Sequence, residues 1–293
     1  MGTSIDPRRD VLERLELLGP SSVLQVHGEP RWLIAEMTTQ SRVTVGVDTD
    51  AAAIRKGTEL HRGIAFANVC PQTMQLDRQF DLVIVGGLER LSLASRRAVI
   101  HTSVQHCSPR GHVAVVHAKR ECLLPLDDFD LDPVPEHSPE GSPDQPQGSF
   151  VSLYRRSSRF TVHDLVFEAR QTITRVTPPE LLDLLVGANP PLVLDTRTST
   201  DRMRFGVIEP SVHVPRTVLE WHLDPASGYL HPSIVSFDQS LVVACNGGYS
   251  SSLAAANLVR LGYTSVADLI GGAQAWRSAG LPMGMPDHSH LDF

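Results

Sequence analysis

Residues 240–256 read SLVVACNGGYSSSLAAA, and this stretch decides the fold of the second half of the chain. Its apolar beginning predicts a buried strand that ends at Cys245, and its alanine-rich end predicts a helix. The two glycines between them let the backbone curl with its N–H groups turned inward. The stretch therefore predicts an anion-binding turn between a strand and a helix N-terminus, where open α/β sheets build their sites.

Cys245 is the candidate nucleophile of this turn. Converging N–H groups and the positive end of a helix dipole lower the pKa of a nearby thiol, and the same groups can hold a persulfide. The residues assigned to persulfide or substrate binding are Asn246, Gly247, Gly248, Tyr249, Ser250 and Ser251. The alternative interpretation makes Cys245 a small buried side chain at a strand end, as most free cysteines are.

The sequence around the turn predicts a complete α/β domain. Thr177-Pro-Pro-Glu180 has the pattern of a helix start, with a Thr cap, prolines in the first turn and a Glu three residues after the cap. We expect helices at 180–186 and 251–261, and strands at 191–194, 241–244 and 266–269.

These motifs resemble the rhodanese family. An Asp-x-Arg sequence follows the first strand as Asp195-Thr-Arg197, and residues 206–216 loosely match the Gly-His-Ile-Pro-Gly-Ala segment of the family. The closing signature Leu-x-Gly-Gly-x-x-x-Trp-x-x-x-Gly-Leu-Pro runs from Leu269 to Pro282. The resemblance covers a little over a third of the chain.

The resemblance implies a sulfurtransferase domain at 177–284, in which Cys245 carries a sulfane sulfur as a persulfide. It implies no cofactor and no metal for this reaction, and a small-molecule or protein sulfur donor and acceptor as partners. The turn has six residues from Cys245 to Ser250. Within the family this length belongs to sulfurtransferases, whereas related dual-specificity phosphatases have one residue more, so the resemblance indicates sulfur transfer.

The turn departs from the family pattern at Ser250, where the resemblance expects an arginine. A hydroxyl cannot hold an anionic donor in bidentate fashion, so thiosulfate is expected to bind weakly. Arg202, Arg204 or Arg216 would restore the charge if one of them entered the pocket. As an alternative, Tyr249 presents an aromatic wall to a bulkier organic persulfide.

Asp195 and Arg197 have two interpretations. They either line the pocket or tie loops together through buried hydrogen bonds, and the structural role is favoured. For the domain as a whole, the alternative to an enzyme is a non-catalytic sensor or adaptor in which Ser250 marks lost activity.

The first part of the chain alternates between strand and helix patterns. Strands are expected at 22–26, 43–47, 80–85 and 112–117 and a helix at 91–107, which predicts a doubly wound, Rossmann-like parallel sheet. The proline-rich and acidic stretch 125–148 is expected to be an exposed loop. Residues 150–155 and 160–167 are expected to be edge strands of this sheet. The predicted boundaries are a first domain at 1–170, a linker at 171–176 and a tail at 285–293.

The strand order and spacing of this domain resemble class I S-adenosylmethionine-dependent methyltransferases. Val45-Gly-Val-Asp48 matches the second strand of that family, and Asp48 and Gly28 are the candidate cofactor-binding residues. The glycine-rich turn of the family is degenerate, because its three glycine positions hold His27, Glu29 and Arg31. A normal pose of S-adenosylmethionine is therefore not expected. The domain is either a scaffold or partner-binding module, which we favour, or an altered nucleotide pocket; a working methyltransferase with an accessory rhodanese domain is a further alternative.

Composition bounds these interpretations. The chain has 293 residues and a formal net charge of −7, which argues against a nucleic-acid partner. The sequence contains no run of 18 or more apolar residues, so no membrane span is predicted. The four cysteines form no CxxC pair and no disulfide framework, so the reducing cytoplasm is the expected setting. Among the 26 basic residues only Lys56 and Lys119 are lysines, a skew typical of GC-rich bacterial genomes.

Overall fold

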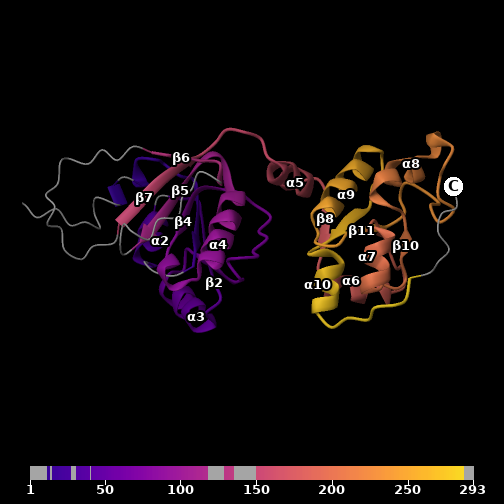
Figure 1. Cartoon of the computed structure of the whole chain (residues 1–293), viewed down its shortest axis with the longest axis horizontal. Coiled ribbons are helices and arrows are strands. Elements are labelled where there is room, and N and C mark those ends of the chain that lie inside the picture. The colour runs from indigo at the N-terminus through magenta and orange to yellow at the C-terminus, as the bar shows by residue number, and fades with distance from the viewer. Residues whose placement is uncertain are drawn as a thin grey trace, which may run out of the picture. The chain divides into compact units, whose positions relative to one another are not determined.

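The computed structural model describes residues 12–13, 15–27, 31–39, 41–117, 129–134 and 150–286. The chain divides into two compact units, Met1–Phe160 and Thr161–Phe293 (Figure 1). Each unit is an α/β fold built on its own sheet, which confirms the predicted two-domain α/β architecture. Within the described residues, no helix has the length and apolar character needed to cross a membrane.

The first unit contains a seven-stranded sheet in the order β3-β2-β1-β4-β5-β7-β6. Strands β1 to β5 are parallel to one another, and β7 runs antiparallel to β5 and β6. The chain winds outward in both directions from β1, which makes the sheet doubly wound. Its elements are β1 (Ser22–Val26), α2 (Arg31–Met37), β2 (Val43–Asp48), α3 (Ala51–Leu60), β3 (Ala65–Asn68), β4 (Phe80–Val85), η1 (Leu88–Arg90), α4 (Leu93–Gln105), β5 (Cys107–His117), β6 (Leu131–Pro133) and β7 (Phe150–Arg156).

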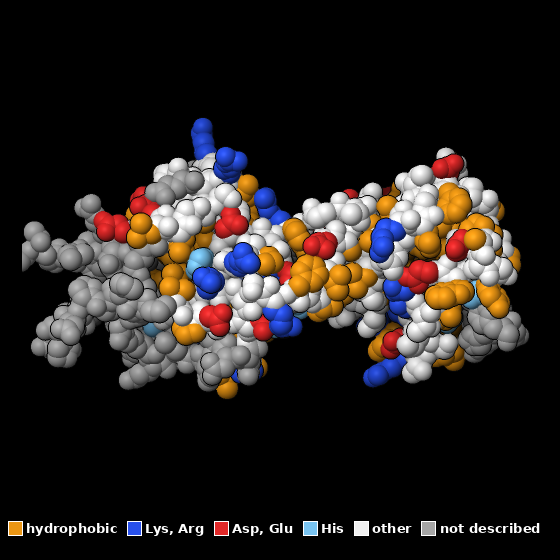
Figure 2. All heavy atoms as spheres, turned by 90° about the horizontal axis from the view of Figure 1, so that it is seen from above, with side chains coloured by type: hydrophobic (Ala, Val, Ile, Leu, Met, Phe, Trp, Pro, Cys, Tyr) orange, Lys and Arg blue, Asp and Glu red, His pale blue; other side chains and the backbone are white. Residues whose placement is uncertain are grey.

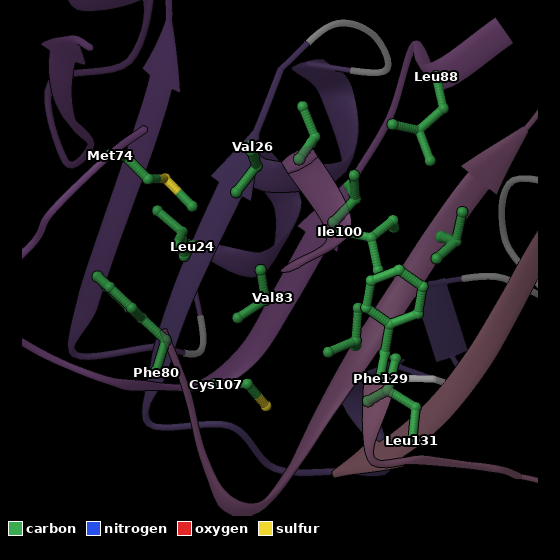
Figure 3. Packing of buried hydrophobic residues seen from close by; sticks show 14 of the residues in the cluster. Leu24, Val26, Met74, Phe80, Val83, Leu88, Ile100, Cys107, Phe129 and Leu131 are labelled. Atoms are coloured by element: carbon green, nitrogen blue, oxygen red, sulfur yellow. The ribbon is translucent and has the colours of Figure 1, made fainter. Parts of the chain in front are cut away.

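Both faces of this sheet are buried. Side chains alternate between faces along a strand, so Leu24 and Val26 of β1 pack into one cluster while Val23 packs into the other. The first cluster also takes Ile100 from α4 and Phe129 (Figure 3). The continuous apolar runs read from the sequence reflect this two-sided burial.

The second unit contains a five-stranded sheet in the order β10-β9-β11-β12-β8, and all of its strands are parallel to their neighbours. Residues of α8 and α9 pack against one face, and residues of α6 and α10 against the other (Figure 1). Its elements are α5 (Val162–Arg170), β8 (Thr174–Val176), α6 (Pro178–Leu185), β9 (Leu192–Asp195), α7 (Ser199–Phe205), β10 (Val212–His213), η4 (Arg216–Val218), α8 (Leu219–Leu223), η5 (Pro225–Ser227), β11 (Leu241–Ala244), α9 (Ser250–Arg260), β12 (Val266–Leu269) and α10 (Gly272–Ser278).

The structure corrects the expected region between the domains. Residues 160–167 do not form an edge strand, because Thr161 and Asp164 form a capping box that starts helix α5. The expected linker 171–176 contains β8, which pairs with β12 in the second sheet. The boundary between the units therefore lies at Phe160, ten residues before the expected end of the first domain at 170.

The expected exposed loop 125–148 is also partly wrong. Leu131–Pro133 form β6, which pairs with β7, and Phe129 and Leu131 are buried in the core. Residues 125–128 and 135–148 lie outside the described residues.

Candidate active site

Cys245 lies at the carboxyl edge of the second sheet. It follows β11, whose four residues are all buried between β9 and β12. Ser250, at the end of the turn, begins the eleven-residue helix α9. This is the predicted arrangement of strand, turn and helix, and it leaves Cys245 only 6% exposed.

The sulfur of Cys245 receives hydrogen bonds from its own turn. The backbone N–H of Gly248 donates to Sγ at 3.1 Å, and the hydroxyl of Ser251 lies 3.2 Å from Sγ. Burial by itself raises the pKa of this thiol. Hydrogen bonds from the side chains of Ser250 and Ser251 and from the backbone of Ser251 and Gly248 outweigh burial, so the pKa of Cys245 lies below its ordinary value.

Helix α10 turns the carbonyl groups of the loop outward. The N–H of Ala273 donates to the carbonyl oxygen of Cys245 at 2.8 Å, and the N–H of Gln274 donates to that of Asn246 at 3.0 Å. This close approach requires glycine at Gly272, because a Cβ there would lie 2.4 Å from the carbonyl oxygen of Cys245. The glycine pair of the closing signature thus has a physical role in shaping the turn.

Gly248 requires glycine for a related reason. Its φ is +75°, and a Cβ would lie 2.5 Å from the backbone nitrogen of Gly271. Of the six turn residues proposed from the sequence, Gly248, Ser250 and Ser251 bond the sulfur. Asn246, Gly247 and Tyr249 do not hydrogen-bond the sulfur in the described turn. The Tyr249 ring lies 3.5 Å from the place of a Cβ on Gly247, an ordinary van der Waals distance.

Asp195 and Arg197 lie beside the site but bond each other. Arg197 donates to both carboxylate oxygens of Asp195, at 2.9 and 2.7 Å, and to the carbonyl oxygen of Gly206. Arg202 donates to the same carboxylate at 3.3 Å, and all three charged side chains are buried. This geometry fits the structural role, in which Asp-x-Arg ties the ends of β9 and α7 together.

The two other candidate arginines have partners elsewhere. The guanidinium of Arg204 stacks on Phe205 with its carbon 5.0 Å from the ring centre. Arg216 forms an i,i+4 ion pair with Glu220 at 2.9 Å.

The sequence did not identify three side chains that hold the turn. Arg170 on α5 donates to the carbonyl oxygen of Gly248 at 2.9 Å and to the hydroxyl of Ser252 at 3.2 Å. Ser252 in turn donates to Asp268 at 2.6 Å. In the sequence, only the Thr161–Asp164 capping pattern indicates helix α5. The hydrogen bond between Ser252 and Asp268 is indicated only by an aspartate within an apolar strand.

Asp48 lies at the end of β2, while Gly28 lies outside the described residues. The Oδ1 atom of Asp48 accepts hydrogen bonds from the N–H groups of Thr49 and Asp50 at 2.7 and 3.1 Å. The same atom lies 4.0 Å from Nδ1 of His27. The carboxylate is therefore engaged by its own neighbours.

The described residues around Asp48 do not fit S-adenosylmethionine. His27 stands at a glycine position of the family with φ +55°. The ring of Phe66 lies 2.7 Å from the place of a Cβ on Gly46 and fills the space beside β2. The hollow lined by His27, Asp48, Ile54 and Phe66 measures about 20 Å³. That volume holds about one water molecule.

Two comparisons concern the second unit. Thiosulfate sulfurtransferase GlpE of Actinobacillus succinogenes is 34% identical over 110 residues, which cover 38% of this chain and 89% of that protein. A solved structure from Rhodopseudomonas palustris, described as a protein of unknown function and possible tyrosine phosphatase, is 33% identical. It covers 42% of this chain and 94% of that one, with a TM-score of 0.40.

A third comparison concerns the first half of the chain. The crystal structure of N-methyltransferase NodS from Bradyrhizobium japonicum, in complex with S-adenosylhomocysteine, is 16% identical. It covers 52% of this chain and 89% of that one, with a TM-score of 0.44.

The family model of the rhodanese-like domain matches residues 177–279, which contain the whole Cys245 turn and the closing signature as far as Ala279. Together with the identity to GlpE over most of that protein's length, the match shows that this chain belongs to the rhodanese family through its second unit.

Proposed function

We propose that the chain moves a sulfane sulfur from a donor to an acceptor through a persulfide on Cys245. The observation that carries this proposal is the hydrogen bonding of Sγ by Gly248 and Ser251 at the start of α9. Those bonds favour the thiolate, which is the attacking form of cysteine. Membership of a family with sulfurtransferase relatives supports the same class of enzyme.

The reaction is a double displacement. The Cys245 thiolate attacks the outer sulfur of the donor; an S–S bond forms on Sγ while the donor's bond to that sulfur breaks, and the remainder leaves with the electron pair. A nucleophilic acceptor then attacks the outer sulfur of the persulfide and restores the thiolate. No net oxidation occurs, so the transfer needs no redox cofactor.

The turn is suited to hold the persulfide anion. The carbonyl groups of Cys245 and Asn246 are engaged by α10 and point away, which favours N–H groups of Asn246 to Ser251 facing the sulfur. The helix dipole of α9 adds positive potential at the same place. Asn246, Gly247 and Tyr249 would contact the added outer sulfur and not Sγ itself.

We infer that an organic persulfide is a better donor than thiosulfate. Ser250 supplies a hydroxyl where a guanidinium would hold two anionic oxygens, and the arginines expected to replace it are bonded to Asp195, Phe205 and Glu220. Tyr249 is 42% exposed at the mouth of the turn and offers an aromatic surface to an organic group.

The partners that fit this activity are a donor and an acceptor, each a small molecule or a protein. On the face shown in Figure 2, Lys and Arg side chains lie among acidic side chains, and such a mixed surface does not favour binding to nucleic acid. A reducing cytoplasm suits a transfer that depends on a free thiol. Within the described residues Cys70 and Cys245 are free thiols.

Steady-state sulfur transfer tests the proposal. The full chain is assayed with glutathione persulfide or thiosulfate as donor and cyanide as acceptor, beside Cys245→Ser and Cys107→Ser variants. The wild type and Cys107→Ser are expected to transfer sulfur, with a higher kcat/KM for the persulfide, and Cys245→Ser is expected to lose at least about a thousandfold in rate. Equal activity of Cys245→Ser would overturn the assignment.

A further inference from the structure

A third carbonyl group of the turn is held from outside the family domain. Helix α10 takes the carbonyl oxygens of Cys245 and Asn246, but that of Gly248 accepts a hydrogen bond from Nη2 of Arg170 at 2.9 Å. Arg170 ends α5, and the rhodanese-like match begins only at residue 177. An element added before the family domain therefore contacts its active-site turn.

The position of Arg170 is fixed by a chain of hydrogen bonds into the sheet. Its Nε donates to Ser252 Oγ at 3.2 Å, and Ser252 donates to Oδ2 of Asp268 at 2.6 Å. Asp268 also accepts two hydrogen bonds from Arg175, at 2.8 and 3.3 Å. The side chains of Asp268 and Arg175 are 0% and 7% exposed, so the chain is anchored in the core.

Two further contacts keep the guanidinium against the turn. Its carbon lies 5.7 Å from the centre of the Tyr249 ring, within the range of a cation–π contact. Helix α5 packs against α9, and its capping box fixes where the helix begins. Arg170 thus meets the turn through the Gly248 carbonyl, the Tyr249 ring and the first turn of α9.

We propose that Arg170 is a positioning residue of the Cys245 site, which orients the Gly248–Tyr249 peptide and supplies the positive charge that Ser250 does not. This inference rests on the proposed sulfur transfer at Cys245. A guanidinium on the carbonyl of a peptide polarises that peptide and strengthens its N–H as a donor. The N–H of this peptide belongs to Tyr249, in the part of the turn that would hold the outer sulfur.

The other charged groups near the turn are paired. Among the described residues of the packed elements, Asp268 on β12 faces Arg175 on β8, and Asp195 on β9 faces Arg197 and Arg202.

The test compares Arg170→Gln and Arg170→Lys with a matched control, Arg277→Gln. Arg277 is an exposed arginine whose guanidinium stacks on Phe205, 4.4 Å from the ring centre. Two readouts are measured on the full chain: the pH dependence of Cys245 alkylation by iodoacetamide, and kcat/KM for sulfur transfer from glutathione persulfide.

In Arg170→Gln we expect the alkylation inflection to rise by roughly half to one pH unit and kcat/KM to fall about tenfold. Arg170→Lys keeps the charge but cannot bond Gly248 and Ser252 together, so intermediate values are expected. If both variants match Arg277→Gln within about twofold, the proposal is overturned. Should Arg170→Gln fail to fold, Arg170→Lys decides by the same criterion.

The two readouts separate this inference from the proposed function. If the wild type transfers no sulfur, the proposed function is wrong. The pH dependence of Cys245 alkylation in the wild type and the Arg170 variants still reports whether Arg170 acts on the thiol. If the wild type transfers sulfur and neither readout changes in the Arg170 variants, only the inference about Arg170 is wrong.

Discussion

Two serine hydroxyls and two backbone N–H groups act on the thiol of Cys245 and overcome the effect of its burial. Because the shift of the pKa is downward, the thiolate is populated at a lower pH than in an ordinary cysteine. The reactivity of Cys245 should therefore rise with pH and level off once pH exceeds this lowered pKa. The effect depends on a few hydrogen bonds, so single substitutions can remove part of it.

The Ser251→Ala variant tests this at one residue. It removes the hydroxyl 3.2 Å from Sγ, so the pKa of Cys245 should rise and the alkylation inflection should move up by about half a pH unit. At neutral pH the alkylation rate should fall a few-fold. Ser278→Ala, on the exposed part of α10, serves as the control. An inflection that stays in place in Ser251→Ala would count against hydrogen-bond control of this thiol.

At this scale the sequence predicts local chemistry better than tertiary contacts. Cys245, Gly248 and Ser251 lie within seven residues of one another, so their meeting follows from the turn itself. Arg170 and Asp268 are distant in sequence and meet the turn only once the sheet has formed. The pairing of Asp195 with Arg197 was among the expected alternatives, because the two side chains are two residues apart after a strand.

Helix α10 and the Cys245 turn form one structural element, joined at Gly272. In Gly272→Ala the new Cβ would lie 2.4 Å from a backbone oxygen, so α10 must withdraw from the turn. Gly280→Ala is the matched control, since Gly280 has φ +69° and a Cβ there meets nothing within 4 Å. Both variants share the strain of a positive φ, and only Gly272→Ala adds the clash.

We expect Gly280→Ala to lower the free energy of unfolding by about 1 kcal/mol and to keep activity. Gly272→Ala should lose roughly 1–3 kcal/mol more and reduce sulfur transfer at least tenfold. Chemical denaturation and the transfer assay check these values. Equal losses in the two variants would mean that α10 does not shape the turn.

Helix α5 shows why an element can be misread from the sequence. The stretch 160–167 begins with alternating apolar and polar residues, which is typical of an edge strand that follows another strand. The capping box of Thr161 and Asp164, together with Val166 and Ala169 buried three residues apart, decides for a helix. Strand β8 has three residues, too few to show a period of two, and only pairing with β12 reveals it.

At the scale of the whole molecule, the second unit begins before the family match. A fragment of residues 161–293 is expected to unfold cooperatively near the temperature of that unit in the full chain. A fragment of residues 177–293 loses β8 and Arg175, which leaves the buried carboxylate of Asp268 without its ion pair. The loss is about 3–5 kcal/mol, or a melting temperature lower by at least about 10 °C. Equal melting of both fragments by circular dichroism would refute this boundary.

The first unit keeps the doubly wound sheet, and its described residues leave little space beside Asp48 for the cofactor that the resemblance implies. Calorimetric titration of the full chain with S-adenosylmethionine is expected to give no saturable heat up to about 1 mM. The reason is steric, because Phe66 and His27 occupy the space beside Asp48. A saturable isotherm near one site per chain would contradict it. The degenerate turn made this predictable from the sequence, whereas the filling of the space by Phe66 depends on packing.

The intact mass of the full chain after treatment with a sulfane donor tests the central claim most directly. We expect the wild type to gain the mass of one sulfur atom, which peptide mass spectrometry then places on the Cys245 peptide. Cyanide is expected to remove this sulfur, and Cys245→Ser is expected to gain none. A wild type that stays unmodified, or that carries the sulfur on another cysteine such as the exposed Cys70, would contradict it.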